Sequence, residues 1–162
     1  ACPCAGTPAQ CPALPQARAA ARSTADCCGC RRTEETAAAL ASGIAVNGGK
    51  PVWGVYSTFI QRTYDQISQD ICINNNPVTI VNFCGSVYGM NDVTHLGLYD
   101  IPMMSNIPNL VYLTPTTKEE YLAMLDWSID QTEHPVAIKL PGGNMVSDGK
   151  KITKDFSKLN TY

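Results

Sequence analysis

The feature that most constrains this fold is the alternation of helical patterns with short apolar runs between residues 34 and 140. Three stretches have the Ala-rich or apolar-periodic character of helices: residues 34–45, 57–71 and 118–131. Four short apolar stretches are typical of strands: residues 50–56, 78–83, 109–113 and 135–140. A chain that alternates helix and strand in this order predicts an α/β fold of three layers, in which a mostly parallel sheet is flanked by helices.

Capping motifs mark the ends of the predicted helices. The Asn-Gly-Gly motif at residues 47–49 predicts a helix stop, because glycine readily takes the left-handed backbone conformation that ends a helix. Ser57 is expected to cap the second helix. Thr117 and Glu120 have the spacing of a capping box at the start of the third.

Composition and charge restrict the possible functions. Hydrophobic residues make up 44% and charged residues 16% of the 162-residue chain, which favours a globular domain over a disordered chain. The net charge is −2 and the 12 basic residues are scattered, so no nucleic-acid surface is predicted. No apolar run approaches the roughly 20 residues of a membrane helix, and four early prolines oppose a secretory signal. We therefore expect a cytoplasmic protein with no nucleic-acid or membrane partner.

The first 33 residues differ from the remainder of the chain. They contain six of the eight cysteines and are rich in Ala, Pro and Arg, without helical or strand periodicity. We expect residues 1–33 to be disordered or the product of a frameshift, residues 34–143 to form the α/β domain, and residues 144–162 to begin a linker. An alternative is that the cysteines bind zinc, although their Cys-Cys and Cys-x-Cys spacings differ from the paired Cys-x-x-Cys of structural zinc sites.

Ligands of parallel sheets bind beyond the carboxyl ends of the strands, which points to residues 56–62, 84–97 and 139–144. Residues 84–106 are expected to form a long loop, and a connection of that length in a compact domain is usually functional. Residues 56–66 read YSTFIQRTYDQ. This segment closely resembles the YSTFLQRAYDQ segment of 1-deoxyxylulose-5-phosphate synthases.

Further segments match the same family in the same order: residues 48–52, 94–97, 107–110 and Pro115 with its following helix. The resemblance covers about residues 34–160. It implies the second, pyrimidine-binding domain of a thiamine-diphosphate enzyme of the transketolase or 1-deoxyxylulose-5-phosphate synthase type, which transfers two-carbon ketol or acyl units. The family places the first strand of the sheet ahead of residue 34, where residues 27–33 lack a strand pattern, so that strand is expected to be missing.

The resemblance also implies cofactors and partners. Thiamine diphosphate would be shared with a diphosphate-binding domain outside this chain, which would hold Mg²⁺, because the chain has no GDG…N motif. A phosphorylated sugar or small keto compound would be the substrate, and the assembled enzyme would be a homodimer. The isolated chain is expected to be inactive.

Glu34 is the catalytic acid that the resemblance implies. It lies nine residues before Gly43, at the spacing that separates the family's glutamate from the glycine of its AAGLA motif. A poorly hydrated carboxylic acid at this place would lend a proton to the cofactor's pyrimidine ring, which activates the cofactor. From the pattern alone, Glu34 and Glu35 would simply complement the helix dipole.

Three residues of the segment at residues 56–66 and one loop histidine complete the expected site. Phe59 would stack on the aminopyrimidine ring, with Tyr56 and Arg62 beside it as further cofactor contacts. His95 matches the histidine of the family's DGPTHQG loop and would act as a second catalytic residue near the substrate. Without the resemblance, Phe59 reads as a core anchor, Arg62 as a surface cation and His95 as a solvated loop residue.

The expected substrate contacts depart from the family pattern. Asn91 stands where an aspartate is expected, and Cys84 and Lys139 stand where phosphate-binding arginines are expected. Asn91 and Lys139 remain the expected substrate-binding residues, although lysine lacks the bidentate fork of arginine. A transketolase-like enzyme with another acceptor therefore fits equally well, and no metal-binding residue is expected. The alternatives are a β-type subunit of a 2-oxo acid dehydrogenase and a non-catalytic binding module.

Overall fold

The computed structural model describes residues 33–85 and 94–150, together with Ile152 and Phe156. Contacts divide the chain into two units, Ala1–Thr33 and Glu34–Tyr162, and nearly all described residues belong to the second. The expectations for residues 1–32, including the missing strand and the six cysteines, lie outside the described residues. The same holds for Asn91.

The elements follow the predicted order. They are α1 (Thr33–Val46), β1 (Val52–Tyr56), α2 (Ser57–Ile60), the 3₁₀ turn η2 (Gln61–Thr63), α3 (Tyr64–Gln66), the π-helical segment η3 (Ile67–Cys72), β2 (Thr79–Phe83), α4 (Asp100–Met104), β3 (Val111–Leu113), α5 (Lys118–Asp130) and β4 (Val136–Lys139). The four described strands pair in the order β1-β2-β4-β3, and every pair is parallel. This confirms the predicted parallel sheet flanked by helices.

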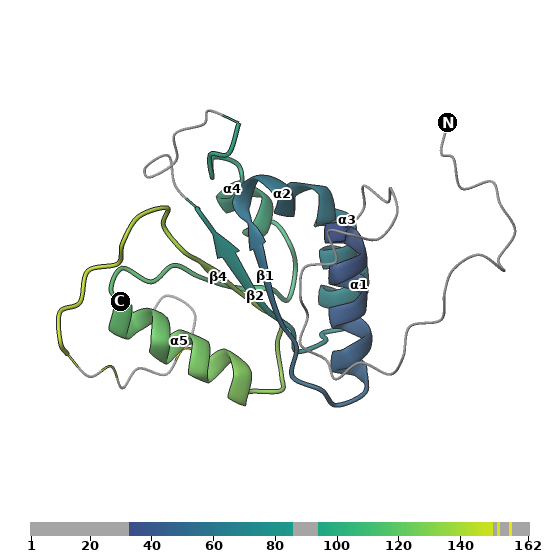
Figure 1. The fold of residues 1–162 in the computed structure, drawn as a ribbon. Helices are drawn as coiled ribbons and strands as arrows, with labels where there is room; N and C mark the ends of the chain where they lie inside the picture. The colour runs from purple at the N-terminus through teal and green to yellow at the C-terminus, as the bar shows by residue number, and fades with distance from the viewer. Residues whose placement is uncertain (1–32, 86–93, 151, 153–155, 157–162) are drawn as a thin grey trace, which may run out of the picture. The chain divides into compact units, whose positions relative to one another are not determined.

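The two faces of the sheet are covered by different helices (Figure 1). On one face, Ile80 of β2 belongs to the same apolar core as Ala38 and Ala41 of α1 and Ile60 and Ile67 of the run from α2 to η3. On the other face, α5 packs against β2, where the buried Thr79 hydroxyl is 3.1 Å from the carbonyl oxygen of Ser128 and 3.2 Å from its Oγ.

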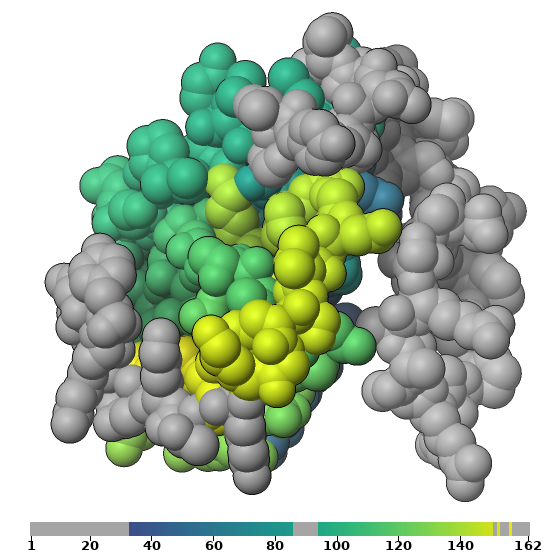
Figure 2. All heavy atoms as spheres, turned by 90° about the vertical axis from the view of Figure 1, so that its left-hand side faces the viewer, coloured from purple at the N-terminus to yellow at the C-terminus, as the bar shows by residue number. Residues whose placement is uncertain are grey.

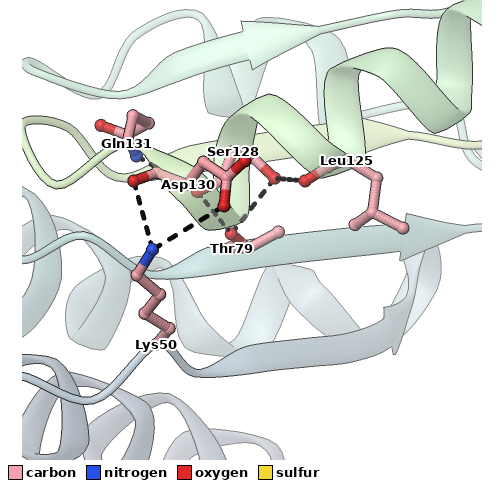
Figure 3. A network of polar contacts seen from close by, with 6 residues as sticks. All are labelled: Lys50, Thr79, Leu125, Ser128, Asp130 and Gln131. Carbon is pink, nitrogen blue, oxygen red and sulfur yellow. Dashed lines mark hydrogen bonds and ion pairs between the residues drawn. The ribbon is translucent and has the colours of Figure 1, made fainter.

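Figure 3 shows this second contact from close by, with Thr79 beneath the last turn of α5. The Ser128 hydroxyl also donates to the Leu125 carbonyl at 2.8 Å, so it has a partner inside its own helix. At the exposed end, Lys50 Nζ lies 3.2 Å from the Asp130 carbonyl oxygen. These contacts set the position of α5 along β2.

A buried polar cluster ties α1 to η3. Ser42 Oγ donates to the Asp70 carbonyl at 2.8 Å, and Asn76 Nδ2 donates to both Ser42 Oγ (2.9 Å) and the same carbonyl (3.0 Å). Because α1 begins next to Glu34 and η3 continues the run that carries Phe59, this cluster fixes two parts of the expected site relative to each other.

The predicted stop of α1 and the Thr117 half of the predicted capping box of α5 are confirmed. Gly48 has a φ of +79°, the left-handed conformation that closes α1. At the start of α5, Thr117 Oγ1 accepts a hydrogen bond from the Glu120 N–H at 3.2 Å. The Glu120 carboxylate accepts from the Thr116 N–H at 2.9 Å, one residue earlier than a capping box would place it.

The predicted helix cap at Ser57 is wrong. Tyr56 occupies the N-cap position of α2, and Ser57 is its first helical residue. The buried Ser57 hydroxyl points toward the sheet and donates to Asn82 Oδ1 at 2.8 Å. It therefore anchors α2 to β2 instead of closing the helix end.

The predicted long loop over residues 84–106 is partly wrong, because α4 lies within it. Met104 of α4 is fully buried and joins the apolar core, which gives this short helix its stability. Residues 86–93 of the loop lie outside the described residues. None of the helices in the described part of the chain has the length and apolar character needed to cross a lipid bilayer.

The segment after β4 returns to the start of α5, and Figure 2 shows it (yellow) on the same face as α5 (green). The Lys118 N–H donates to the Val146 carbonyl at 3.0 Å, and the Asp148 N–H donates to Glu119 Oε2 at 3.2 Å. The Ser147 hydroxyl donates to the other oxygen of Glu119. Residues 146–148 are thus attached to the domain, and the expectation of a linker from residue 144 stays a prediction.

This attachment is expected to depend on pH. The hydrogen bond from Ser147 is the main cause that lowers the pKa of Glu119 from 4.5 to about 2. A carboxylate with a lowered pKa stabilises the folded state above its unfolded pKa, so the contribution is present above about pH 4.5 and lost as pH falls toward 2. The Asp148 amide resonance in NMR should titrate with a midpoint near pH 2. In Ser147→Ala the titration midpoint should move up toward pH 4.5. An unchanged midpoint would mean that the Ser147 hydrogen bond is not the main cause of the lowered Glu119 pKa.

Candidate functional site

Five of the seven predicted site residues gather at the carboxyl ends of the strands. Glu34 begins α1, Tyr56 ends β1, Phe59 and Arg62 follow on α2 and η2, and His95 lies in the segment before α4. They come from three parts of the sequence that the parallel sheet brings to one edge.

Arg62 connects the acid to the aromatic ring. Its Nη1 lies 3.7 Å from Glu34 Oε2, and its guanidinium carbon lies 5.1 Å from the centroid of the Phe59 ring, in cation–π geometry. The Glu34 side chain is only 19% exposed, whereas that of Arg62 is 52% exposed. The Glu34 carboxylate is therefore largely covered, and the half-exposed Arg62 side chain lies beside it.

Aromatic side chains line the site beside this pair. Phe59 makes edge-to-face contacts with His95, at 5.3 Å between centroids, and with Tyr56, at 6.1 Å. Tyr56 also contacts Phe83 at the end of β2, at 6.5 Å. Both Tyr56 and Phe83 are exposed, so they present ring surface at the strand ends.

The sequence interpretation missed Phe83. Its signal was available, because Phe83 is the last residue of a predicted strand, next to the strand that ends in Tyr56. Gly54 of β1 makes room for it: a Cβ on Gly54 would lie 2.6 Å from Phe83 Cε2. A side chain at position 54 would therefore displace the Phe83 ring.

His95 is held close to α2 by contacts on both sides. Thr58 Oγ1 lies 3.4 Å from the Leu96 carbonyl oxygen, which attaches the segment to the helix. His95 Nδ1 lies 2.8 Å from Thr94 Oγ1. The Phe59 contact completes this environment, so the imidazole ring has a defined place at the edge of the site.

Lys139, the predicted substrate contact at the end of β4, lies in an ion pair. Its Nζ is 2.9 Å from Asp100 Oδ2, and the side chains are 13% and 0% exposed. A substrate phosphate would have to compete with this buried partner, and the substrate role of Lys139 stays a prediction.

The described residues contain no cluster of three His, Cys, Asp or Glu side chains that could hold a metal ion. Cys72 and Cys84 are free thiols, and burial raises the pKa of Cys72 to about 12. Because the other six cysteines lie outside the described residues, the zinc alternative remains a prediction.

The arrangement combines a mostly covered carboxylate, a flat aromatic surface and an imidazole at the carboxyl edge of a parallel sheet. This defines an α/β domain with aromatic and charged side chains gathered at the strand ends, where the ligands of parallel sheets bind. Over residues 17–146 the sequence matches the family described as transketolase, pyrimidine binding domain. The chain belongs to this family.

Named relatives agree with that assignment. The chain is 39% identical over 125 residues to the 1-deoxy-D-xylulose-5-phosphate synthase of Clostridium acetobutylicum, an alignment that covers 76% of this chain and 20% of the relative. It is 44% identical over 114 residues to the same enzyme of Clostridium beijerinckii, covering 70% of this chain and 18% of the relative. The chain thus spans about a fifth of the length of these relatives.

Solved structures show the same fold. Transketolase from Pichia stipitis superposes with a TM-score of 0.67 at 21% identity, over 74% of this chain and 18% of that one. A split-gene transketolase described as an inactive β4 tetramer gives a TM-score of 0.62 at 21% identity, over 74% of this chain and 39% of that one. Together with the family match, these relatives support the transketolase-type interpretation over the 2-oxo acid dehydrogenase alternative.

Proposed function

We propose that this chain supplies the aminopyrimidine-binding half of a thiamine-diphosphate site in a transketolase-type enzyme that transfers two-carbon units. The observation that carries the proposal is the approach of Arg62 to both Glu34 and Phe59, which joins the expected acid to the expected stacking ring. His95 contacts the same ring.

The residues present fit one half of the cofactor. The Phe59 ring offers a flat apolar surface for the pyrimidine, and the largely covered Glu34 carboxyl group is the hydrogen-bonding partner proposed for a ring nitrogen. When bound, thiamine diphosphate supplies the carbon nucleophile of the reaction. Since the described residues offer no metal-ligand cluster, the proposal leaves Mg²⁺ and the diphosphate to a partner domain.

The remaining roles follow from the same proposal. Tyr56 and Arg62 are further cofactor contacts, His95 is a catalytic group near the substrate, and Asn91 and Lys139 contact a phosphorylated sugar or small keto substrate. The working enzyme is a cytoplasmic homodimer in which this domain meets a diphosphate-binding domain or subunit of the same enzyme. Self-association of a relative of the same fold, the split-gene transketolase β4 tetramer, supports the oligomeric part.

A binding experiment tests the proposal. The 162-residue chain is mixed with a separately produced diphosphate-binding domain of a 1-deoxyxylulose-5-phosphate synthase, and binding of thiamine diphosphate with Mg²⁺ is measured by calorimetry. We expect binding by the mixture and none by this chain alone. Phe59→Ala should weaken binding about tenfold or more, because a stacked aromatic contact and its buried area are lost.

Tyr99→Ala is the matched control, because Tyr99 is an exposed aromatic residue outside the aromatic contacts described for the site. It should leave the affinity unchanged. Equal effects of the two variants would remove Phe59 from the site. Absence of binding by a mixture in which both components are folded would contradict the proposed function.

A further inference from the structure

A network of hydrogen bonds around the fully buried Asp100 side chain spans strands β2, β3 and β4. Lys139 Nζ (2.9 Å), Tyr112 OH (3.0 Å) and Asn82 Nδ2 (3.3 Å) all converge on Oδ2 of Asp100. Asn82 continues the chain, because its Oδ1 accepts the Ser57 hydroxyl at 2.8 Å. The network joins residues from three strands to α4 and to the first residue of α2.

Each contact in this network has a defined direction. The Asp100 carboxylate can only accept, so Asn82 turns its NH₂ group toward Asp100. This leaves the amide oxygen facing Ser57, whose hydroxyl therefore donates. Burial, followed by the neighbouring Asp100 carboxylate, raises the pKa of Tyr112, which keeps its phenol in the donating form. The orientation of the Ser57 hydroxyl therefore depends on the position of Asp100.

The backbone is shaped to let Lys139 reach Asp100. A Cβ on Gly85 would lie 2.5 Å from Lys139 Cγ and 2.8 Å from its Cε, so the lysine side chain runs directly over this glycine. The Gly85 N–H donates to the Leu140 carbonyl at 2.6 Å, which holds the two segments together. Any side chain at position 85 would push Lys139 away from its partner.

We infer that this network, with Asp100 at its centre, is a positioning device for the site. Ser57 is held by the network, and the next two residues carry the site contacts: Thr58 reaches the Leu96 carbonyl and Phe59 contacts His95. Ser57, Asn82 and Asp100 are thus positioning residues that set the place of Phe59 and His95. The inference deepens the proposed function, since it concerns the same site, but its geometry does not require the cofactor.

NMR of the histidine side chains tests this inference on the 162-residue chain without a partner domain. The chain has two histidines. The imidazole protons of His95 should be shifted by the ring current of Phe59, which His95 contacts edge to face. His134 lies two residues before β4 and serves as an internal reference. Ser57→Ala removes only the link between network and helix. We expect the His95 resonance to lose its ring-current shift while the His134 resonance stays in place.

Thr63→Val is the matched control, because it removes another buried hydroxyl of the same helical run, one that donates to the Ile60 carbonyl and has no contact with the network. It should leave His95 unchanged. Asn82→Leu should change the His95 resonance as Ser57→Ala does. The double variant should cause no further change, as expected for two members of one hydrogen-bond network.

An unchanged His95 resonance in Ser57→Ala would overturn the inference, and so would an equal change in Thr63→Val or a simultaneous change of His134. Failure of the proposed function would appear differently, as absence of thiamine-diphosphate binding with these histidine shifts intact.

Discussion

Glu34→Gln is expected to lower cofactor activation by about 100- to 10,000-fold while leaving cofactor binding nearly intact. The amide keeps the size and one hydrogen-bonding oxygen of the side chain but cannot hold and return a proton. Activation is measured in the mixture with the diphosphate-binding domain, as the rate at which the C2 proton of bound thiamine diphosphate exchanges for deuterium. Calorimetry on the same variant reports binding.

Glu35→Gln is the matched control, because it removes the same charge from the same helix turn one residue away. The ion pair of Arg62 is with Glu34, and Glu35 Oε2 is buried with no hydrogen-bond partner among the residues that the structure describes. Its exchange rate should equal that of the unchanged chain. If the C2 proton of bound thiamine diphosphate exchanges equally fast in both variants, Glu34 is a carboxylate at a helix start without a catalytic role.

Lys139→Met is expected to destabilise the domain by about 3–5 kcal/mol, because it leaves the fully buried Asp100 carboxylate without a cation. Methionine keeps much of the side-chain volume, so the effect reports the lost charge. The free energy of unfolding is measured by urea denaturation. Adding Asp100→Asn should recover much of the loss, since both charges are then absent.

The control for this prediction is Lys50→Met. Lys50 pairs with Asp130 at 3.9 Å, but their side chains are 48% and 85% exposed, and such surface pairs contribute about 0–1 kcal/mol. If Lys139→Met lowers the free energy of unfolding no more than Lys50→Met does, the ion pair of Lys139 with Asp100 is well solvated. The Asp100→Asn/Lys139→Met variant also tests the predicted substrate role: unchanged binding of a phosphorylated sugar by the mixture with the diphosphate-binding domain would exclude Lys139 as a phosphate contact.

The local elements were predictable because their causes act within a few residues. The β-branched run that became β2 and the glycine that closes α1 carry their structure in their own side chains and backbone freedom. The helix α4 was missed, because five residues containing a proline show no period, and the burial of Met104 stabilises it. The predicted cap at Ser57 was wrong, because the Ser57 hydroxyl is hydrogen-bonded to Asn82 of β2 and not to the helix end.

The site was predictable only in part. Phe59, Arg62 and Tyr56 lie within seven residues of one another, so a single recognisable segment brought them together. The resemblance also predicted Glu34 and His95 as site residues. It did not predict the ion pair of Arg62 with Glu34 or that of Lys139 with Asp100. Phe83 was not predicted as a site residue, because its contact with Tyr56 depends on the neighbouring strand and on the absence of a side chain at Gly54.

The sequence by itself determined the parallel α/β class, most of the element boundaries and the edge of the sheet where the candidate site residues lie, because periodicity, turn residues and chain order act locally. Only the tertiary structure decided which polar groups are partners. Ser57, Asn82, Asp100 and Lys139 are distant in the chain and meet because β2 lies between β1 and β4. Burial then forces each of them to find a hydrogen-bond partner, and the partner is whichever group the strand order brings within reach.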